Sequence, residues 1–253
     1  MKTILETLQN KLIVSCQAFP GSPLYGADYM QKMAMCAIKG GAAGIRACWE
    51  DNVRSIREIT DLPIIGINKA LSHTPPTIND VIITPTFESA AEVIEAGCDI
   101  VGLDCTPRGR TYDDVAEIID QIKKHYPDVL ILADISTLEE GIMSEQMGVD
   151  IVSTTLSGYT VESLKVYNVE FTDKGELLSS KNLKKLKNPD INLVKRLREK
   201  IKIKINAEGR YAETKQVIKA MCTGADMITI GSAITMPEKI TAKFVDAIDS
   251  NFN

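Results

Sequence analysis

The sequence of 253 residues lacks several features that mark particular classes of protein. It has no apolar run near the roughly 18 residues that a membrane-spanning helix needs, and residues 1–12 contain no apolar signal core. Its formal net charge of −5 gives no overall excess of basic side chains for a phosphate backbone. We therefore expect a cytoplasmic protein that binds neither a membrane nor nucleic acid.

Signatures of metal binding and redox chemistry are also scarce. His73 and His125 are the only histidines, and the six cysteines include no CxxC pair. This pattern disfavours structural zinc and favours reduced cysteines that pack as small apolar side chains. The composition itself, 44% hydrophobic and 25% charged, is typical of a globular domain. We expect one domain over residues 1–253.

Short apolar runs rich in β-branched residues recur along the chain, and amphipathic stretches lie between them. This alternation is typical of parallel strands that are buried on both faces and joined by helices. Eight strands are predicted, at residues 12–17, 43–47, 63–68, 100–104, 129–134, 151–154, 203–207 and 227–230. Eight helices are predicted, at residues 29–39, 52–60, 90–96, 113–125, 138–147, 191–200, 213–223 and 237–250. Left-handed C-caps are expected at Gly40-Gly41, Gly97, Gly148 and Gly224.

Two stretches do not fit this repeat. A ninth apolar run at residues 81–86 follows the third strand closely, with Pro75 and Pro76 between them, so we assign it to an elaborated loop. Residues 157–189 are too long and polar for a βα connection, which usually spans roughly 2 to 6 residues. We expect a lid or an insertion after the sixth strand.

Eight βα units in a chain of this length predict an α/β protein with a single (β/α)8 TIM barrel. The main alternative is a doubly wound open sheet, because periodicity alone does not close a barrel. Such a sheet usually has a glycine-rich turn after its first strand, and here that turn reads CQAFP. The barrel is therefore favoured, with its functional side chains at the carboxyl ends of the strands.

Polar side chains stand at the ends of the predicted strands. They are Gln17, Arg46, Lys69, Asp104, Asp134, Thr154, Glu208 and the turn at Gly231. Lys69 is the sharpest candidate, because a desolvated lysine has a lowered pKa and can act as a base or form a Schiff base. A solvated loop lysine is the alternative. Glu208 is a candidate acid, or else a rim carboxylate that pairs with Arg210.

The remaining strand-end residues allow more than one function. Asp104 and Asp134 could be acid/base groups, magnesium ligands or salt-bridge partners. Arg46 suits a carboxylate or phosphate of a ligand, but it could also pair with Asp134 or Glu208. Glycines in the turns after the last two strands would let backbone N–H groups approach a phosphate. These turns contain Gly209, Gly231 and Ser232.

Motifs at the strand ends occur in a fixed order along the chain. They read IVSCQA (13–18), GGAAGIRA (40–47), LPIIGI (62–67) followed by Lys69, ITPT (83–86), ADISTLEEG (133–141), VSTTLSGYT (152–160), EGR (208–210) and GSAIT (231–235). Taken together, they resemble the bacterial N-acetylmannosamine-6-phosphate 2-epimerases, a family of ribulose-phosphate-binding barrels. The resemblance covers almost the whole chain.

This resemblance implies the interconversion of N-acetylmannosamine 6-phosphate and N-acetylglucosamine 6-phosphate in sialic-acid catabolism. It implies a homodimer that uses no metal and no nucleotide cofactor. Lys69 would be the acid/base lysine and Glu208 its carboxylate partner. The residues that position the substrate would be Gln17, Arg46 and Asp134. Their strand-end positions add two further candidates for substrate binding, Thr154 and Arg210.

Two features depart from the pattern of the family. Met236 follows GSAIT where an arginine is typical, so one expected phosphate contact is missing. Residues 167–188 form a longer insertion than expected, near the mouth of the barrel. Two other functions therefore stay open. One is an aldolase that uses Lys69 as a Schiff-base amine, and the other is a non-catalytic protein that binds a sugar phosphate.

Overall fold

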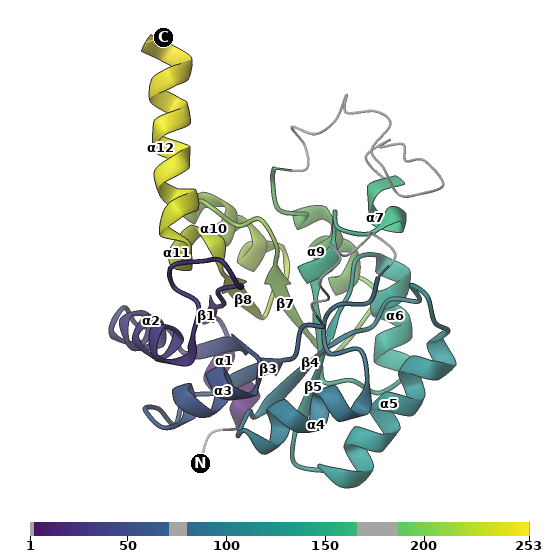
Figure 1. Ribbon diagram of the computed structural model, residues 1–253. Helices are drawn as coiled ribbons and strands as arrows, with labels where there is room; N and C mark the ends of the chain where they lie inside the picture. Colours follow the sequence, from purple (N-terminus) through teal and green to yellow (C-terminus); the bar gives the residue numbers. More distant parts are fainter. Residues whose placement is uncertain (1–2, 71–79, 166–186, 253) are drawn as a thin grey trace.

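The chain folds around eight parallel strands that close into a barrel (Figure 1). The computed structural model describes residues 3–70, 80–165 and 187–252. The strands pair in sequence order, and the first also pairs with the eighth. They are β1 (Leu12–Cys16), β2 (Gly44–Cys48), β3 (Ile64–Ile67), β4 (Ile100–Asp104), β5 (Leu130–Asp134), β6 (Ile151–Ser153), β7 (Lys204–Glu208) and β8 (Met227–Ile230). The predicted TIM barrel is confirmed, and the open sheet is excluded.

Helices surround the barrel, and all eight predicted helices are present. They are α2 (Ala27–Lys39), α3 (Glu50–Arg57), α4 (Phe87–Glu95), α5 (Tyr112–His125), α6 (Leu138–Gln146), α9 (Ile191–Arg198), α10 (Thr214–Thr223) and α12 (Pro237–Phe252). The sequence does not predict four short helices: α1 (Ile4–Leu8), η1 (Thr154–Leu156), α7 (Val161–Lys165) and α11 (Ser232–Thr235). No helix among the described residues is long and apolar enough to cross a membrane.

Local signals in the sequence explain where several helices begin and end. α4, α5 and α6 each follow a threonine whose hydroxyl accepts a hydrogen bond from the backbone N–H three residues later. The side chain of that later residue bonds back, which completes a capping box. Glycines after four helices adopt φ between +82° and +122°, a conformation that costs glycine little. These residues are Gly41, Gly97, Gly148 and Gly224, so left-handed caps are confirmed there.

Some strands end a residue away from their predicted bounds, which changes the position of three candidate residues. β1 ends at Cys16, so Gln17 lies just past the strand. β7 continues to Glu208, which is therefore its last residue. β6 ends at Ser153, because Thr154 already belongs to the 3-10 turn η1.

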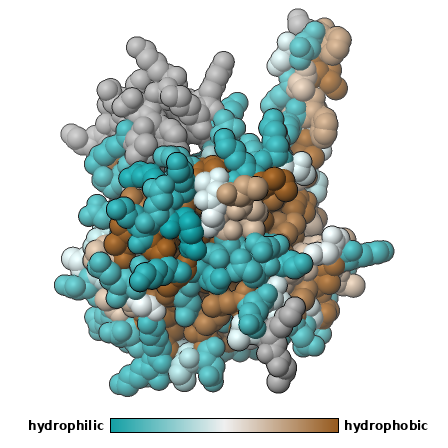
Figure 2. Space-filling model, turned by 180° about the vertical axis from the view of Figure 1, so that it is seen from behind, coloured by the Kyte–Doolittle hydropathy of each residue, from teal (hydrophilic) through white to brown (hydrophobic). Residues whose placement is uncertain are grey.

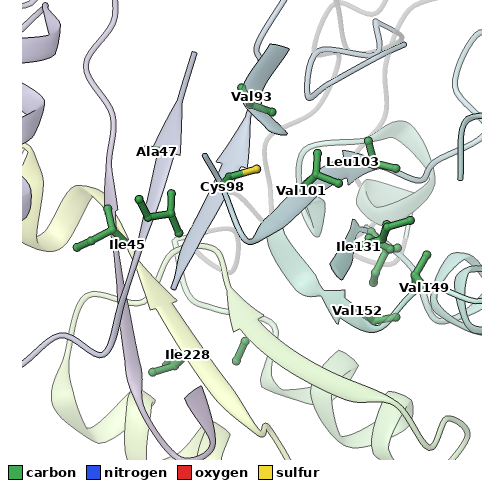
Figure 3. Close-up of a cluster of buried hydrophobic side chains, with 14 of the residues drawn as sticks. Ile45, Ala47, Val93, Cys98, Val101, Leu103, Ile131, Val149, Val152 and Ile228 are labelled. Atoms are coloured by element: carbon green, nitrogen blue, oxygen red, sulfur yellow. The ribbon is translucent and has the colours of Figure 1, made fainter. Parts of the chain in front are cut away.

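The alternation of side chains along the strands creates two apolar regions. Outward side chains such as Ile45 and Ala47 pack against the helices, and Figure 3 shows part of this cluster. Inward side chains near the amino ends of the strands fill the barrel floor with Ile13, Ile65, Ile100, Leu132, Ile151 and Met227. Further along the strands the inward positions become polar, as at Arg46, Asp134 and Asn206. The polar site therefore lies on an apolar floor.

The ninth apolar run forms a loop, as predicted, and this loop pairs with the end of β3. Ile83 makes an isolated antiparallel bridge with Lys69. The N–H of Thr84 donates to the carbonyl of Asn68 at 2.8 Å, and the N–H of Asp104 donates to the carbonyl of Ile83 at 3.0 Å. The loop therefore fixes the backbone of Lys69 between β3 and β4.

The connection after β6 is as long as predicted. It begins with η1 and α7, and the chain returns to the barrel wall at α9. Residues 166–186, which make up most of the predicted insertion, lie outside the described residues.

The last helix, α12, extends away from the barrel instead of covering it (Figure 1). None of its described residues is buried. Four large apolar side chains are exposed, namely Val245 at 48%, Ile248 at 57%, Phe244 at 66% and Phe252 at 83%. In Figure 2, hydrophobic surface lies along this helix and on the barrel wall below it. The sequence predicts the helix but not its detachment from the barrel.

The barrel floor provides a test of the core. Ile100 is fully buried on the inner face of β4, whereas Ile59 is 36% exposed on the surface. We expect Ile100→Ala to lower the free energy of unfolding by about 2–5 kcal/mol, because it removes buried contacts and leaves a cavity. The matched change Ile59→Ala should cost at most about 1 kcal/mol. Urea denaturation measures both, and equal losses would contradict the assigned inner layer.

Candidate active site

Arg46 on β2 lies between two carboxylates inside the barrel. Its Nη1 and Nη2 donate to Oδ1 and Oδ2 of Asp134 at 3.0 and 2.7 Å, a bidentate pair. Nη1 also donates to Oε2 of Glu208 at 3.0 Å. The side chains of Arg46 and Asp134 are 1% and 0% exposed, and that of Glu208 is 12% exposed. One cation therefore joins two carboxylates in a space almost closed to water.

Burial and charge act in opposite directions on these groups. Burial lowers the pKa of Arg46, but attraction to Asp134 and Glu208 outweighs it and raises that pKa above its ordinary value. Burial raises the pKa of Glu208, and Arg46 only partly offsets this effect. Glu208 therefore holds a proton more readily than a solvated glutamate, as a group that exchanges protons near neutral pH must.

Lys69 lies just past the end of β3, where Trp49 and Phe19 contact it. The indole N–H of Trp49 donates to the Lys69 carbonyl at 3.0 Å. Nζ lies 4.8 Å from the centre of the Phe19 ring, within range of a cation–π contact. Burial is the largest effect on the pKa of Lys69 and lowers it; Cys48 and the nearby carboxylates oppose this, while Arg46 adds to it. The neutral amine is therefore favoured more than in a solvated lysine.

Thr154 is hydrogen-bonded to the backbone of Glu208, and Gln17 has a buried oxygen without a partner in the described part of the chain. Oγ1 of Thr154 donates to the carbonyl of Glu208 at 2.8 Å and accepts from its N–H at 3.1 Å, so it fixes the Glu208 backbone. Nε2 of Gln17 donates to Oγ of Ser15 at 2.7 Å. Oε1 of Gln17 is buried and has no hydrogen-bond partner among the described residues. A ligand that donates a hydrogen bond would remove the cost of that unpaired acceptor.

Gly209 and Arg210 follow β7 with φ of +103° and +62°. Nε of Arg210 donates to the carbonyl of Asn188 at 2.9 Å, and Nη1 donates to the carbonyl of Ser157. The guanidinium also lies 5.3 Å from the centre of the Tyr159 ring. Arg210 therefore joins the two ends of the long connection after β6, and the structure does not pair it with Glu208.

The turn after β8 leads into α11. Gly231 precedes this helix, and Ser232 is its first residue. Oγ1 of Thr235 donates to the carbonyl of Ser15 at 2.9 Å, which holds α11 against β1. Backbone N–H groups in the first turn of a helix have no acceptor within the helix, so they are available to an anion. Met236 lies between α11 and α12 and offers no charge.

Asp104 is engaged within its own loop. It accepts hydrogen bonds from the N–H and Oγ1 of Thr106 at 3.1 and 2.6 Å and from Nη2 of Arg108 at 2.5 Å. Asp104 is therefore a salt-bridge partner. No group of three or more His, Cys, Asp or Glu residues that could hold a metal ion occurs in the described part of the chain.

A groove of about 810 Å³ lies outside the barrel, between α6, α9 and α10. Its lining includes Leu138, Ile191 and Lys219 but none of the predicted site residues. The shifted pKa values of Lys69 and Glu208 instead favour the barrel mouth as the candidate active site.

The sequence analysis does not include four polar residues that form the hydrogen-bond network around the two carboxylates. These residues are Ser153, Thr155, Asn206 and Thr229, and three of them lie on strands. Thr229 interrupts the apolar run MITI (227–230) at an inward position, which is a signal in the sequence, whereas Asn206 only continues the alternation of polar and apolar residues in KIKIN (202–206). The sequence-based prediction used only the ends of the strands, because barrel sites usually lie there.

A buried cluster of this kind at the carboxyl ends of barrel strands is typical of a barrel enzyme that moves protons on a small molecule. A family profile described as "Putative N-acetylmannosamine-6-phosphate epimerase" matches residues 30–250. The matched range includes most of the chain and most of the predicted site residues. The chain belongs to this family, and the resemblance of its motifs is confirmed.

Individual relatives agree with this assignment. A protein of Caldanaerobacter subterraneus named "Putative N-acetylmannosamine-6-phosphate 2-epimerase" is 41% identical over 250 residues, covering 97% of this chain and 94% of its own. A protein of Clostridioides difficile with the same name is 38% identical over 249 residues, covering 98% and 100%. The solved N-acetylmannosamine-6-phosphate 2-epimerase of Clostridium perfringens is 36% identical, with a TM-score of 0.81 over 97% of this chain and 96% of that one.

Arg46, Asp134 and Glu208 form a buried charge cluster, called the Arg46 cluster below. We expect a change at Arg46 to lower the stability of the fold by an amount that depends on pH. Arg46→Met leaves Asp134 and Glu208 without their buried cation and should cost about 3–5 kcal/mol of unfolding free energy near neutral pH. Without Arg46 the pKa of Glu208 in the folded protein rises further above its value in the unfolded chain. A carboxyl group of this kind lowers the stability of the fold as the pH rises from the unfolded-state pKa through the folded-state pKa. The loss should therefore be smaller at about pH 5 than at about pH 8.

Urea denaturation at both pH values measures this loss. The matched control is Arg54→Met, because Arg54 forms an exposed ion pair with Glu50, with the two side chains 53% and 45% exposed. The control should lose less than about 1 kcal/mol. Equal losses for Arg46→Met and Arg54→Met would show that the buried cluster is not under the expected electrostatic constraint.

Proposed function

We propose that the protein interconverts N-acetylmannosamine 6-phosphate and N-acetylglucosamine 6-phosphate in sialic-acid catabolism by removing and returning the proton at C2. The observation that carries this proposal is the combination, at one barrel mouth, of a desolvated Lys69 and a Glu208 whose pKa is raised. The names of the relatives support this choice of substrate.

The chemistry requires the open-chain form of the sugar. The proton at C2 is acidic only when C1 is an aldehyde, because the carbonyl then accepts the electron pair that the C–H bond leaves behind. Neutral Lys69 takes the proton on Nζ, a double bond forms between C1 and C2, and the aldehyde oxygen becomes an enolate. Return of a proton to the opposite face of C2 gives the epimer and restores the aldehyde.

The other site residues assist this transfer. Glu208 supplies a proton to the opposite face of C2 or to the enolate oxygen, and each acid/base partner contributes about 10²- to 10⁴-fold. The charge of Arg46, held in place by Asp134, stabilises the negative charge that develops on the substrate. The unpaired Oε1 of Gln17 accepts a hydrogen bond from the substrate, and Thr154 positions the Glu208 backbone.

The phosphate of the substrate binds at the turns after β7 and β8. Backbone N–H groups at Gly209, Gly231 and Ser232 donate to it, and Arg210 adds positive charge at the rim. These donors replace the contact that an arginine would make at Met236. The reaction as proposed requires no cofactor, and a cytoplasmic location without a nucleic-acid partner stays a prediction of the sequence.

We also infer that the chain forms a homodimer through α12. This helix exposes Phe244 and Ile248 and has no buried residue within the described chain. Met35 of α2 and Ile218 of α10 are also exposed, at 52% and 64%. A second copy of α12 would bury apolar surface of this kind on the barrel wall, and burial of such surface stabilises association.

Proton NMR in D2O tests the proposed reaction. The purified protein should convert N-acetylmannosamine 6-phosphate into its C2 epimer and replace the C2 proton with deuterium. Lys69→Met should abolish both changes, because no base remains at that position, and Glu208→Gln should slow them by about 10²-fold or more. Lys11→Met, which changes an exposed lysine, is the matched control and should behave like the wild type.

Borohydride trapping separates this reaction from that of an aldolase. A covalent adduct of Lys69 with a carbonyl substrate would favour the Schiff-base alternative. Absence of conversion by folded wild-type protein would contradict the epimerase proposal, and calorimetric binding without turnover would favour the non-catalytic alternative.

Sedimentation equilibrium tests the dimer. The wild type should have twice the mass of one chain, whereas Phe244→Asp combined with Ile248→Asp should shift it towards the monomer, because charges would then lie in an apolar interface. Ser250→Asp changes the opposite face of α12 and should leave the mass unchanged. A wild-type monomer at all concentrations would contradict the inferred dimer.

A further inference from the structure

Two donors converge on one oxygen of Glu208, and a hydroxyl lies near it. Oε2 accepts from Nη1 of Arg46 at 3.0 Å and from Nδ2 of Asn206 at 3.3 Å, and Oγ of Ser153 lies 3.4 Å away. Asn206 lies two residues before Glu208 on β7, so both side chains point into the barrel. The carboxylate is therefore held at Oε2 by residues of β2 and β7.

The amide of Asn206 is itself held in one orientation. Its Nδ2 donates to Oγ of Ser153 at 2.9 Å as well as to Glu208, and its Oδ1 accepts from Oγ1 of Thr229 at 3.0 Å. Asn206 is 0% exposed and Thr229 is 1% exposed. An amide has one donor end and one acceptor end, so a hydroxyl that donates to Oδ1 keeps the donor end towards Glu208.

A second branch leads from Ser153 to the other carboxylate. Oγ of Ser153 lies 2.7 Å from Oγ1 of Thr155, which donates to Oδ1 of Asp134. Thr155 also helps to keep the pKa of Glu208 lower than burial alone would make it. Neutral side chains thus connect both carboxylates of the Arg46 cluster beneath the mouth.

We propose that Asn206, oriented by Thr229, is a positioning residue that sets the direction and the protonation of Glu208 in the epimerisation. This inference rests on the proposed function for its effect on turnover, but its effect on Glu208 itself does not require substrate. Thr229 does not contact Glu208 in the described hydrogen-bond network. Its hydroxyl acts through the amide, because Oγ1 of Thr229 donates to Oδ1 of Asn206. Thr229 is also the register partner of Glu208 on β8, so the test has to separate the hydroxyl from packing.

The direction of the effect follows from the charges around Glu208. Among the described residues, the charged or titratable groups that act on it are Arg46 on β2, Lys69 after β3 and Asp134 on β5. A donor that bonds the ionised carboxylate favours that form. Loss of the Asn206 donor, or its rotation after loss of the Thr229 hydroxyl, therefore raises the pKa of Glu208.

The test compares Thr229→Val with Thr229→Ser. Valine has nearly the shape of threonine without the hydroxyl, and serine keeps the hydroxyl. Carbon-13 NMR of protein labelled at the glutamate carboxyl, with Glu208→Gln to assign the signal, measures the titration of Glu208 without substrate. We expect Thr229→Val to raise this pKa by about one unit and Thr229→Ser to restore it towards the wild-type value.

Turnover provides the second measurement. Thr229→Val should lower kcat by about tenfold and change KM by less than about twofold, because the hydrogen bond orients a group that acts in the transition state. Thr223→Val is the matched control, since the Thr223 hydroxyl bonds the Lys219 carbonyl on an exposed helix. Asn206→Leu, with and without Thr229→Val, completes a double-mutant cycle, and strong coupling between the two changes supports the path.

Several results would overturn the proposal. One is a Glu208 titration that is the same in folded Thr229→Val and in the wild type. Another is a Thr229→Ser variant as impaired as Thr229→Val, which would show that packing and not the hydroxyl matters. If the wild type does not epimerise the sugar phosphate, the proposed function fails, whereas the titration still decides whether Asn206 and Thr229 control Glu208.

Discussion

The buried contact of Arg46 with two carboxylates is the constraint on which the rest of the site depends. Asp134 binds the guanidinium at both Nη atoms, and Glu208 takes a third hydrogen bond from it. A buried charge without a partner would be strongly destabilising, so each of the three groups fixes the others. The arrangement also leaves Asp134 little freedom to act on substrate directly, because both of its oxygens already hold the arginine.

Two consequences follow for the chemistry. Arg46 offsets much of the negative charge inside the barrel, so burial can lower the pKa of Lys69 even though two carboxylates lie within reach of it. Glu208 shares the charge of Arg46 with Asp134, so Arg46 only partly offsets the effect of burial, which raises the pKa of Glu208. The pKa values of the two groups are therefore shifted towards each other, which favours exchange of a proton between each group and a substrate near neutral pH.

The sequence predicted the barrel because its strands and helices carry strong local signals. The predicted glycine caps occur in the structure, and the position of Lys69, Arg46, Asp134 and Glu208 at strand ends made them candidates. It could not predict which of these touch, because contacts between β2, β5 and β7 depend on closure of the barrel. It also missed Asn206 and Thr229, whose hydrogen bond depends on the register in which β7 pairs with β8. The sequence does not indicate that α12 leaves the barrel, because an amphipathic pattern shows that one helix face is apolar but not which surface that face covers.

We propose that the Arg46 cluster keeps Lys69 available as a neutral base. Nitrogen-15 NMR of lysine-labelled protein, with the Nζ signal of Lys69 assigned through Lys69→Arg, measures this directly. We expect a Lys69 pKa below the ordinary value for lysine in the wild type, and a higher pKa in Arg46→Met, where the carboxylates act on Lys69 without the opposing cation. A wild-type Lys69 that titrates at or above the ordinary lysine value would show that the cluster does not favour the neutral amine.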